Sequence, residues 1–507
     1  MAVKILCATT IGIEAHLIRA EVDLAPGLPG LHIVGLGDKA VEESKERINV
    51  ALKNSGLKPP SSFHKKIIVN LAPADLKKEG SGFDLPIALG FLCATEQVSL
   101  KNIPNHCFVG ELGLDGSLQR IHGIAPIIMA AIKHHEYANI VIPRVNYAEA
   151  SFFKDSIRII PVENILELIE YCEKGIISDI PAIPDAPSIT PELDISEIAG
   201  LESIKRALSI AAAGGHHMLL KGSPGTGKTI LAKALPSILP PLSKDESQEV
   251  TAIYSIAGLL SRELPWVTQR PFRQPHHSAS ASAIIGGGSN PRPGEISLAH
   301  RGVLFLDEFP EFHRDVIEAL RQPLEDGVIS VLRAKQNMTM PARFMLVAAM
   351  NPCLCGYYGD PKHPCSCSMQ TIQKYQRKVS GPILDRIDIV VQVPRIPIAN
   401  LLHHKNTQES SFLREQVIRA RAIQQERFRK NNIHTNSEMG LNNIKNFCAI
   451  GTSSEAILMQ SEKQFLLSPR AIHRILKVSR TIADLDSSDS IADIHLTEAL
   501  QYRDFTM

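Results

Sequence analysis

One stretch of the sequence combines the residue types that hold phosphate groups. It fits the pattern G-x-x-x-x-G-K-[ST] in full and consists of Gly222, Ser223, Pro224, Gly225, Thr226, Gly227, Lys228 and Thr229. An apolar segment, 218–221, precedes it and a helical pattern begins at Ile230, as this motif requires. The glycines let backbone N–H groups turn toward phosphates, Lys228 offers charge to the β and γ oxygens, and the Thr229 hydroxyl suits Mg²⁺. The sequence therefore predicts a site for ATP and Mg²⁺.

Two acidic residues follow a second apolar segment, 303–306. Asp307 could complete the Mg²⁺ ligands, and Glu308 could polarise the water that attacks the γ-phosphate. An acid pair alone would suit a solvated strand end. Together with the phosphate-binding stretch it predicts hydrolysis of ATP.

Three further polar residues could complete this chemistry. Asn351 follows a third apolar segment, 344–349, where its amide could orient water against the γ-phosphate. Arg386 and Arg470 are candidates for stabilising the charge on the transferring phosphoryl group, and Arg470 lies where a late helix begins. Taken alone, Asn351 would suit a turn and each arginine a surface ion pair.

Four of the nine cysteines are clustered as Cys-x-Cys, a nine-residue gap and Cys-x-Cys. They are Cys353, Cys355, Cys365 and Cys367, and turn formers in the gap could fold the two arms together. Four thiolates suit a closed tetrahedral zinc (Zn²⁺) site, in which His363 could replace one thiolate. A reduced, metal-free loop is the alternative. The other cysteines are scattered among apolar neighbours and suit a reduced core.

The hydrophobic pattern indicates the elements that must position these residues. Short apolar runs alternate with helical patterns on both sides of a proline-rich stretch, 178–191. In the first part we expect strands over 66–71 and 139–143 and helices over 41–55 and 124–134. We expect an α/β protein of four segments: a mixed α/β domain (1–175), a linker (176–193), a nucleotide-binding core with a parallel sheet that carries the cysteine cluster as an insertion (194–397) and a C-terminal helical lid (398–507).

Composition limits the partners. The chain has 507 residues, with 54 Lys and Arg against 53 Asp and Glu, and a formal net charge of +1. This balance argues against a basic surface that coats DNA, but it allows a local basic channel. No apolar run reaches the ~18 residues of a membrane span and the N-terminus lacks the order of a signal peptide, so we expect a cytoplasmic protein with no membrane partner.

The order of these motifs resembles that of the AAA+ ATPases. Two further stretches, 272–277 and 285–302, look like the magnesium-chelatase-like branch, and the combination with the N-terminal domain resembles the ComM/YifB family of bacterial proteins over nearly the whole chain. The resemblance implies that Asn351 is the sensor 1 residue, Arg470 the sensor 2 arginine, and Arg386 an arginine finger for a neighbouring subunit. It also implies a homo-oligomeric ring, a hexamer in this family.

Two segments could face the centre of such a ring. The Gly/Pro-rich segment 286–294 carries Arg292, and the segment 325–335, which is typical of a two-stranded hairpin, carries Arg333 and Lys335. Repeated around an axis, these cations would line a basic channel for a DNA backbone. Solvated loop charges are the alternative for each residue.

The family resemblance implies a motor that uses ATP to translocate on single-stranded or branched DNA. It further implies branch migration that helps to integrate incoming DNA during natural transformation, with recombination proteins as further partners. A magnesium-chelatase motor subunit is one alternative; such subunits are built from the ATPase portion alone, so the N-terminal extension argues against it.

The N-terminal domain suggests another alternative. Its stretches 69–89 and 109–125 resemble the ribosomal-S5-like fold that is shared with the Lon protease domain. The motif match places Asp84 at the position of the Lon nucleophilic serine and Ala125 at that of its lysine, and neither residue can do that chemistry. An ATP-dependent protease or chaperone, with Ser81 as the hydroxyl that remains nearby, is therefore the second alternative function.

Overall fold

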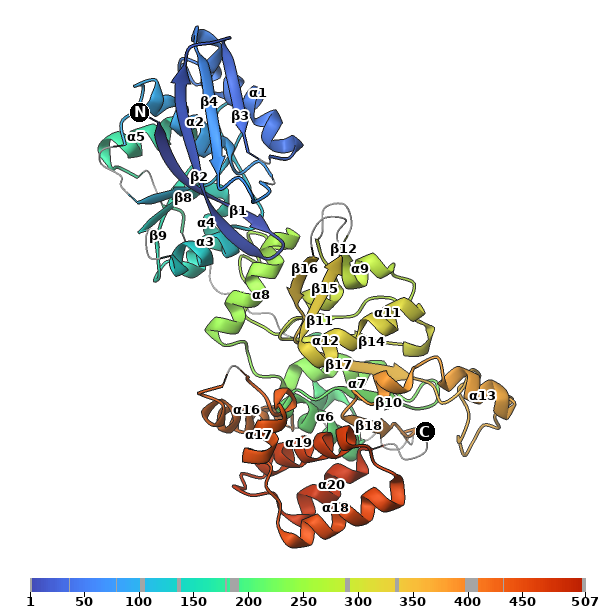
Figure 1. Cartoon of the computed structure of the whole chain (residues 1–507). Coiled ribbons are helices and arrows are strands. Elements are labelled where there is room, and N and C mark those ends of the chain that lie inside the picture. The colour runs from blue at the N-terminus through green and yellow to red at the C-terminus, as the bar shows by residue number, and fades with distance from the viewer. Residues whose placement is uncertain are drawn as a thin grey trace. The chain divides into compact units, whose positions relative to one another are not determined.

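The computed structural model describes residues 2–35, 37–78, 80–100, 105–134, 138–177, 180–182, 191–287, 292–332, 337–396, 409–431 and 433–503. These residues group into two units, each with its own core (Figure 1). Unit 1 comprises Met1–Pro187 and Lys244–Thr268, and unit 2 comprises Ser188–Ser243 and Gln269–Met507. The four segments expected from the sequence stay a prediction.

Unit 1 contains a seven-stranded sheet in the order β3-β4-β2-β1-β5-β8-β9. Its strands are β1 (Val3–Ile11), β2 (Glu14–Ala25), β3 (Gly30–Val34), β4 (Lys66–Ala72), β5 (His106–Phe108), β8 (Asn139–Pro143) and β9 (Arg158–Val162). β1 and β2 form a long antiparallel hairpin, β2 pairs antiparallel with β4, and the remaining neighbours are parallel. The two strands predicted in this domain, now β4 and β8, are confirmed.

Helices cover this sheet. They include α1 (Lys39–Asn54), α2 (Asp84–Ala94), α3 (Ile124–Lys133), α4 (Tyr147–Ala150) and α5 (Ile165–Lys174), and a two-stranded ribbon, β6 (Glu111–Leu112) with β7 (Leu118–Gln119), lies beside them. The predicted helices over 41–55 and 124–134 are confirmed as α1 and α3. Every residue from Asp84 to Leu92 is buried, because α2 packs on β1 and β2 and is apolar around most of its circumference.

Helix α8 (Lys244–Ala257) belongs to unit 1, although it follows the phosphate-binding stretch in the sequence. The Ser255 hydroxyl donates to the carboxylate of Glu149, and the Ala125 amide donates to Ser255 Oγ at 3.4 Å. The Trp266 ring lies 5.8 Å from that of Phe152. Residues 244–268 therefore complete the packing around α3.

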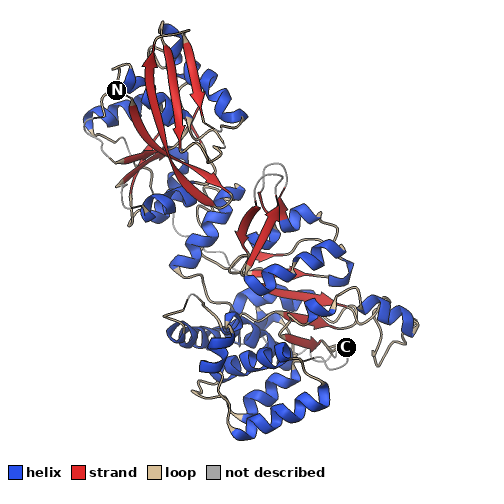
Figure 2. Cartoon of the chain, in the orientation of Figure 1, coloured by secondary structure: helices blue, strands red, loops and turns tan. Residues whose placement is uncertain are grey.

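Unit 2 is built on a five-stranded parallel sheet in the order β11-β14-β17-β10-β18. Its strands are labelled in Figure 1 and drawn as red arrows in Figure 2. The strands are β10 (Met218–Lys221), β11 (Phe272–Arg273), β14 (Val303–Leu306), β17 (Met345–Met350) and β18 (Ile389–Gln392). The three central strands are buried along their whole length, which explains why they read as continuous apolar runs. Helix α6 (Glu202–Gly214) precedes the first of these strands. The helices between the strands are α7 (Lys228–Ala234), α9 (Ala281–Ile285), α10 (Glu295–Leu298), α11 (Arg314–Ala319), α12 (Arg321–Asp326), α13 (Met369–Gln376) and α14 (Gly381–Leu384).

The C-terminal part of unit 2 is helical. It contains α16 (Glu409–Arg427), α17 (Leu441–Phe447), α18 (Thr452–Phe465), α19 (Pro469–Leu485) and α20 (Asp493–Gln501). The apolar stripe of α19 packs against α6, α16 and α20. The predicted fold class, mixed α/β with a parallel sheet and C-terminal helices, is confirmed. Among the described helices none combines the length and the apolar run needed to cross a bilayer.

Two hairpins extend from the sheet of unit 2. One pairs β12 (Gly286–Gly287) with β13 (Arg292–Pro293), and the other pairs β15 (Val328–Leu332) with β16 (Asn337–Pro341). The expectation that both strands of the second hairpin lie within 325–335 is wrong, because its return strand begins at Asn337. The hairpin is longer than expected because its strands pair over five residues each, from Val328 opposite Pro341 to Leu332 opposite Asn337.

Candidate functional site

The phosphate-binding stretch, residues 222–229, connects β10 to α7. Gly225 and Gly227 have φ angles of 77° and 86°, in the left-handed region that residues with a Cβ rarely adopt. A Cβ on Gly222 would lie 2.7 Å from the carbonyl oxygen of Val393, which follows β18. Backbone geometry therefore requires glycine at all three positions of this loop.

Three oxygens hold the ammonium group of Lys228. Its Nζ donates to the carbonyl oxygens of Gly222 at 2.7 Å and Ser223 at 3.0 Å, and to Oδ1 of Asn351 at 3.1 Å. Burial lowers the pKa of Lys228, and the charge of Asp307 opposes this shift. All three acceptors are uncharged, so the buried ammonium group keeps its attraction for an anion.

A hydroxyl and a carboxylate meet beside Lys228. Thr229 Oγ1 donates to Oδ2 of Asp307 at 2.7 Å. Asp307 follows β14 and Asn351 follows β17, the strand between β14 and β10, so all of these residues lie at the carboxyl edge of one parallel sheet. Two oxygens this close can serve as ligands of a single Mg²⁺ ion, which prefers oxygen ligands.

Glu308 lies next to this pair. It has a φ of 50° and a ψ of 44°, and its side chain is 57% exposed. Its Oε2 lies 3.2 Å from Nδ1 of His277, a residue that sequence reasoning used only as part of a family motif. The adjacent histidines, His276 and His277, belong to a family motif, but nothing in the sequence indicated this contact with Glu308.

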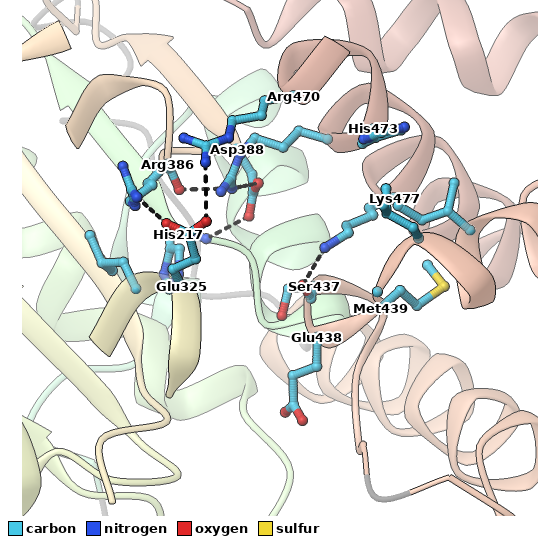
Figure 3. Close-up of a pocket in the computed structure, with 15 residues that line it drawn as sticks. His217, Glu325, Arg386, Asp388, Ser437, Glu438, Met439, Arg470, His473 and Lys477 are labelled. Carbon is cyan, nitrogen blue, oxygen red and sulfur yellow. Dashed lines mark hydrogen bonds and ion pairs between the residues drawn. The ribbon is translucent and has the colours of Figure 1, made fainter. Parts of the chain in front are cut away.

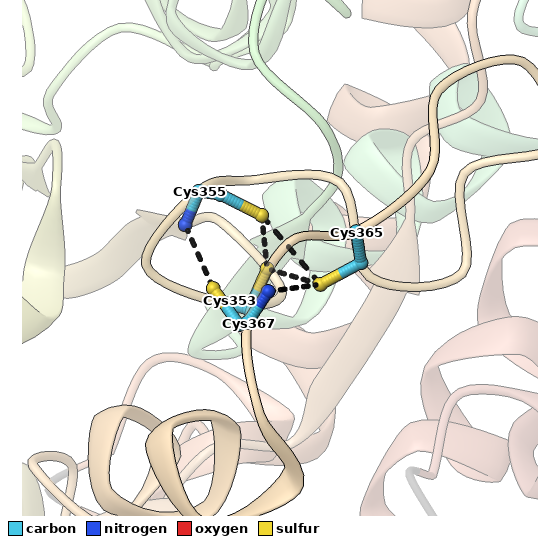
Figure 4. Close-up of side chains that lie close together, drawn as sticks. All are labelled: Cys353, Cys355, Cys365 and Cys367. Carbon is cyan, nitrogen blue, oxygen red and sulfur yellow. Dashed lines mark hydrogen bonds between the residues drawn. The ribbon is translucent and has the colours of Figure 1, made fainter.

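The four clustered cysteines come together as free thiols (Figure 4). All four sulfur atoms lie within 4.8 Å of one another, and three of the pairs are 3.3, 3.5 and 3.6 Å apart. A tetrahedron with Zn–S bonds of about 2.3 Å has edges of about 3.8 Å, so the spacing fits a zinc ion. Backbone N–H groups of Tyr358 and Cys355 donate to Cys353 and Cys367, at 3.3 and 3.4 Å.

The pKa shifts favour a thiolate at Cys355 alone: a backbone N–H also donates to Cys365, but desolvation and the neighbouring sulfur atoms raise the pKa of Cys365 to about 12. Backbone N–H groups of Tyr357 and Ser366 lower the pKa of Cys355 to about 5. His363, the predicted substitute ligand, is exposed and its ring lies 5.1 Å from that of Tyr357. Among the described residues the group that could hold a metal ion consists of the four cysteines and does not include His363.

Arg386 and Arg470 also meet, but at a different place (Figure 3). Both pair with the carboxylate of Glu325, at the end of α12: Arg386 closely, and Arg470 at 3.3 Å. They line a cavity of about 330 Å³, here called the arginine pocket, and none of the residues described as lining it belongs to 222–229. Glu325 was not among the predicted site residues, because an acid in the last turn of a helix carries no signal of its partner.

Other residues that line the arginine pocket hold its arginine side chains in place by hydrogen bonds and ion pairs. Arg474, one turn after Arg470 on α19, pairs with Asp388 and donates to the carbonyl oxygen of Arg386 at 2.8 Å. Burial alone would raise the pKa of Asp388, but the Arg474 guanidinium holds it well below the usual value. Nε of Arg386 is buried and has no hydrogen-bond partner among the described residues. The guanidinium of Arg386 therefore keeps a donor for an incoming acceptor.

Of the three predicted DNA-binding residues, the structure describes one. Arg292 is exposed on β13, where it pairs with Gly287. Arg333 and Lys335 lie outside the described residues.

In unit 1, the positions matched to the Lon dyad are structural. Asp84 is buried at the start of α2 and accepts hydrogen bonds from the Ser44 hydroxyl, from Arg47 Nε at 2.7 Å and from the Leu112 amide at 3.2 Å. Burial raises the pKa of Asp84, and the Arg47 hydrogen bond opposes this shift. Ala125 lies buried in α3, and the Ser81 hydroxyl donates to Glu111.

Three family models match the chain. They are "Magnesium chelatase, subunit ChlI" over residues 194–401, "Subunit ChlI of Mg-chelatase" over 20–146 and "Magnesium chelatase, subunit ChlI C-terminal" over 407–503. A magnesium-chelatase 38 kDa subunit of Rhodobacter capsulatus is 30% identical over 178 residues, which cover 32% of this chain and 51% of that protein. The match to this chelatase subunit therefore covers about a third of the chain, whereas the three family models together extend from residue 20 to residue 503 with gaps between them.

Two relatives that match along nearly the whole chain have higher identity to it than the chelatase subunit has. The competence protein ComM of Haemophilus influenzae is 43% identical over 507 residues, covering 97% of this chain and 96% of that protein. The uncharacterized protein YifB of Escherichia coli is 42% identical over 495 residues, covering 97% and 95%. With its AAA+-like core, its α/β N-terminal unit and its C-terminal helices in the same chain, the protein belongs to the ComM/YifB family.

Proposed function

We propose that the protein hydrolyses ATP and uses the energy to move on DNA. The observation that carries the ATPase proposal is the contact between Lys228 and Asn351, which joins the phosphate-binding loop to the end of β17 beside the Thr229 and Asp307 pair. Phosphoryl transfer needs three parts in one place: a loop that binds the phosphates, ligands for Mg²⁺ and a polar residue that orients the attacking water.

Each residue has a role in this proposal. Backbone N–H groups of 222–229 and the Lys228 ammonium bind the phosphates, and Thr229 and Asp307 hold Mg²⁺, which neutralises developing charge. Glu308 accepts the proton of the attacking water, and Asn351 orients that water. The contact with His277 involves Oε2 of Glu308, and we propose that it orients the carboxylate for this role.

We further propose that Arg386 and Arg470 act on the nucleotide of a neighbouring subunit in a ring, most simply a hexamer. Their position supports this, because the arginine pocket is lined by other residues than 222–229. The unpartnered Nε of Arg386 supports it too, since a phosphate oxygen would satisfy that buried donor. In a ring, each subunit could complete the site of the next. This arrangement explains why Lys228 and the two arginines lie at different places in one chain.

The DNA part of the proposal rests on the relatives and on the hairpins of unit 2. One relative is named a competence protein, which points to DNA taken up during natural transformation. Exposed Arg292, together with Arg333 and Lys335 outside the described residues, would supply cations to a central channel. Branch migration on single-stranded or branched DNA, in company with recombination proteins, is the activity that we propose.

We also propose that Cys353, Cys355, Cys365 and Cys367 hold one zinc ion. Four sulfur atoms near tetrahedral spacing and backbone N–H groups directed at them support a closed structural site. Such an ion would cross-link the loop and would do no chemistry on ATP, because all four ligand positions are filled by protein.

The proteolytic alternative is disfavoured by the surroundings of Asp84. A carboxylate that is buried and bound by Ser44, Arg47 and Leu112 is neither exposed nor nucleophilic. We expect Asp84→Ala to destabilise unit 1 by about 2–3 kcal/mol, since it removes the buried carboxylate that Arg47 and Ser44 bind and leaves Arg47 with Glu43, at 3.9 Å, as its acidic neighbour. Degradation of casein by the wild type, lost in Ser81→Ala, would instead restore the proteolytic alternative.

The test is an ATPase measurement with no DNA, with single-stranded DNA and with forked DNA. We expect DNA to stimulate the wild type, Lys228→Ala to lose ATP binding, and Glu308→Gln to bind ATP without turnover. Lys233→Ala, at a half-exposed lysine on the same helix, is the matched control and should behave as wild type. ATPase activity that neither DNA changes would contradict a DNA motor, and equal resolution of a branched substrate by Lys228→Ala would contradict ATP-driven movement.

A further inference from the structure

The cysteine loop, residues 353–367, is packed against the phosphate-binding loop. It begins two residues after Asn351, whose side chain accepts a hydrogen bond from Lys228. After the loop, α13 returns to the same strand end, where Gln376 Nε2 donates to the carbonyl oxygen of Pro352 at 3.1 Å. Both ends of the cysteine loop are therefore fixed beside the site proposed for ATP.

Asp360 links the two loops directly. Its carboxylate accepts a hydrogen bond from the side chain of Ser223 in the phosphate-binding loop and lies 3.1 Å from Arg395 Nε. Within the cysteine loop it also accepts from the backbone N–H groups of Lys362 and His363, at 2.9 and 3.1 Å. The Asp360 side chain is only 2% exposed, although that of Arg395 is 33% exposed, so the carboxylate itself is shielded from solvent within a network that reaches the surface.

Gly356 makes the second link. It has a φ of 87°, and a Cβ placed on it would lie 2.6 Å from Cγ and Cδ of Pro224. The backbone at Gly356 therefore covers the Pro224 ring directly, and no larger residue fits there without moving one of the two loops.

Apolar packing does not explain why the cysteine loop keeps this shape. Among residues 353–367 only Cys353 and Gly356 are buried, and Leu354 is 63% exposed. Ordering a backbone costs on the order of 1 kcal/mol per residue, and a loop without a core has little to offset that cost. The four sulfur atoms at the centre of the loop are the remaining device that could hold it together.

We propose that metal bound by the four cysteines sets the shape of the phosphate-binding loop, so that zinc content controls the affinity for ATP. This inference rests on the ATP and zinc sites proposed above. Zinc fixes the cysteine loop, Asp360 and Gly356 of that loop support Ser223 and Pro224, and the supported loop presents its N–H groups to the phosphates. Loss of the metal releases the support without removing any phosphate-binding residue.

The experiment measures zinc content and the Kd of a fluorescent ATP analogue on the same full-length samples. We expect one zinc per chain in the wild type, and a Cys365→Ser, Cys367→Ser variant that loses the metal and binds the analogue at least about 10-fold more weakly, as when the competent loop falls to a tenth of the population. Replacement of zinc by Co²⁺ should give thiolate-to-cobalt absorption bands in the wild type. Cys93→Ser, outside the loop, is the matched control for both measurements.

Asp360→Asn separates the support from the metal. It leaves the four thiols in place, so zinc content should stay at one per chain, while the loss of charge in a buried network weakens analogue binding by about 10-fold. Gly356→Ala should behave in the same way. These variants keep the test decisive even where the double cysteine variant fails to fold.

The outcomes distinguish this inference from the proposals beneath it. Unchanged analogue binding after metal loss and in Asp360→Asn would overturn the coupling and leave the ATP site standing. Absence of zinc and of Co²⁺ bands in the wild type would overturn the metal site. Absence of analogue binding in the zinc-loaded wild type would overturn the proposed ATP site itself.

Discussion

The phosphate-binding loop and the arginine pocket both concentrate positive charge, but they neutralise it differently. Lys228 is held by two carbonyl oxygens and an amide oxygen, all uncharged. Arg386 and Arg470 share one carboxylate, that of Glu325. A phosphate that reaches Lys228 displaces neutral acceptors, whereas a phosphate that reaches the arginines competes with an anion.

This difference separates binding from activation. The lysine side of the proposed chemistry is complete within one chain, so each subunit can bind nucleotide alone. The charges of Arg386 and Arg470 are compensated by Glu325 until a phosphate of a neighbouring subunit's nucleotide takes the place of that carboxylate. Assembly would then be the event that brings such a phosphate to the pocket, which would keep hydrolysis slow in isolated subunits.

Removal of the Arg386 guanidinium should have the largest effect on turnover. We expect Arg386→Ala to lower the ATPase rate by about 10³-fold or more, the range known for arginines that stabilise a transferring phosphoryl group, with little change in ATP binding. Steady-state ATPase assays and equilibrium binding of a fluorescent ATP analogue measure the two quantities. A loss of binding as large as the loss of rate would place Arg386 at the site of its own chain.

Mixing variants sharpens the same point. Arg386→Ala and Glu308→Gln are each expected to be inactive alone, but in a mixed ring an intact Glu308 of one subunit would meet an intact Arg386 of the next. Mixed samples should therefore regain part of the activity. No recovery, in samples shown to exchange subunits, would contradict an arginine that acts between subunits.

Lys228→Ala should have the next largest effect, and on binding rather than on turnover. We expect ATP affinity to fall by about 10²- to 10³-fold, because a buried charge that is directed at the phosphates is lost. Mixing Lys228→Ala with other variants should not restore ATP binding to the Lys228→Ala subunits, because the lost residue belongs to their own phosphate-binding loop. The Lys233→Ala control should bind ATP as the wild type does, and weak binding by both variants would indicate a damaged α7 instead.

Glu325→Gln should have the smallest effect and tests the competition directly. Neutralising the carboxylate removes the anion that holds Arg386 and Arg470, so we expect half-maximal ATPase activity at about 2- to 5-fold lower protein concentration, the worth of a partly exposed ion pair. Asp326→Asn, an exposed neighbour, is the matched control. A higher concentration requirement in Glu325→Gln would mean that the carboxylate positions the arginines in the active ring.

The nucleotide site could be assembled from the sequence because its parts follow strands. Thr229, Asp307 and Asn351 each come soon after an apolar run, and the carboxyl ends of parallel strands share one edge of a sheet. The cysteine cluster could be predicted from spacing for a similar reason, since its two arms are close in the chain. In each case the geometry follows from local motifs and one general rule about parallel sheets.

Contacts between distant segments could not be predicted in this way. Glu325, His277 and Asp360 carry no motif that names Arg386, Glu308 or Ser223 as a partner. Helix α8 has an ordinary amphipathic sequence, and nothing in it indicates that it packs in unit 1 with Glu149. The hydrophobic pattern reports which face of an element is buried, but it does not report against what.

The sequence by itself therefore determined the family, the mixed α/β class and the residues proposed to bind ATP, Mg²⁺ and zinc, because short motifs and strand periodicity specify local geometry. Only the tertiary structure decided that Arg386 and Arg470 share Glu325 away from the phosphate-binding loop, and that Asp360 and Gly356 join the cysteine loop to it. These arrangements depend on side-chain packing between segments that the chain brings together only when the whole core folds.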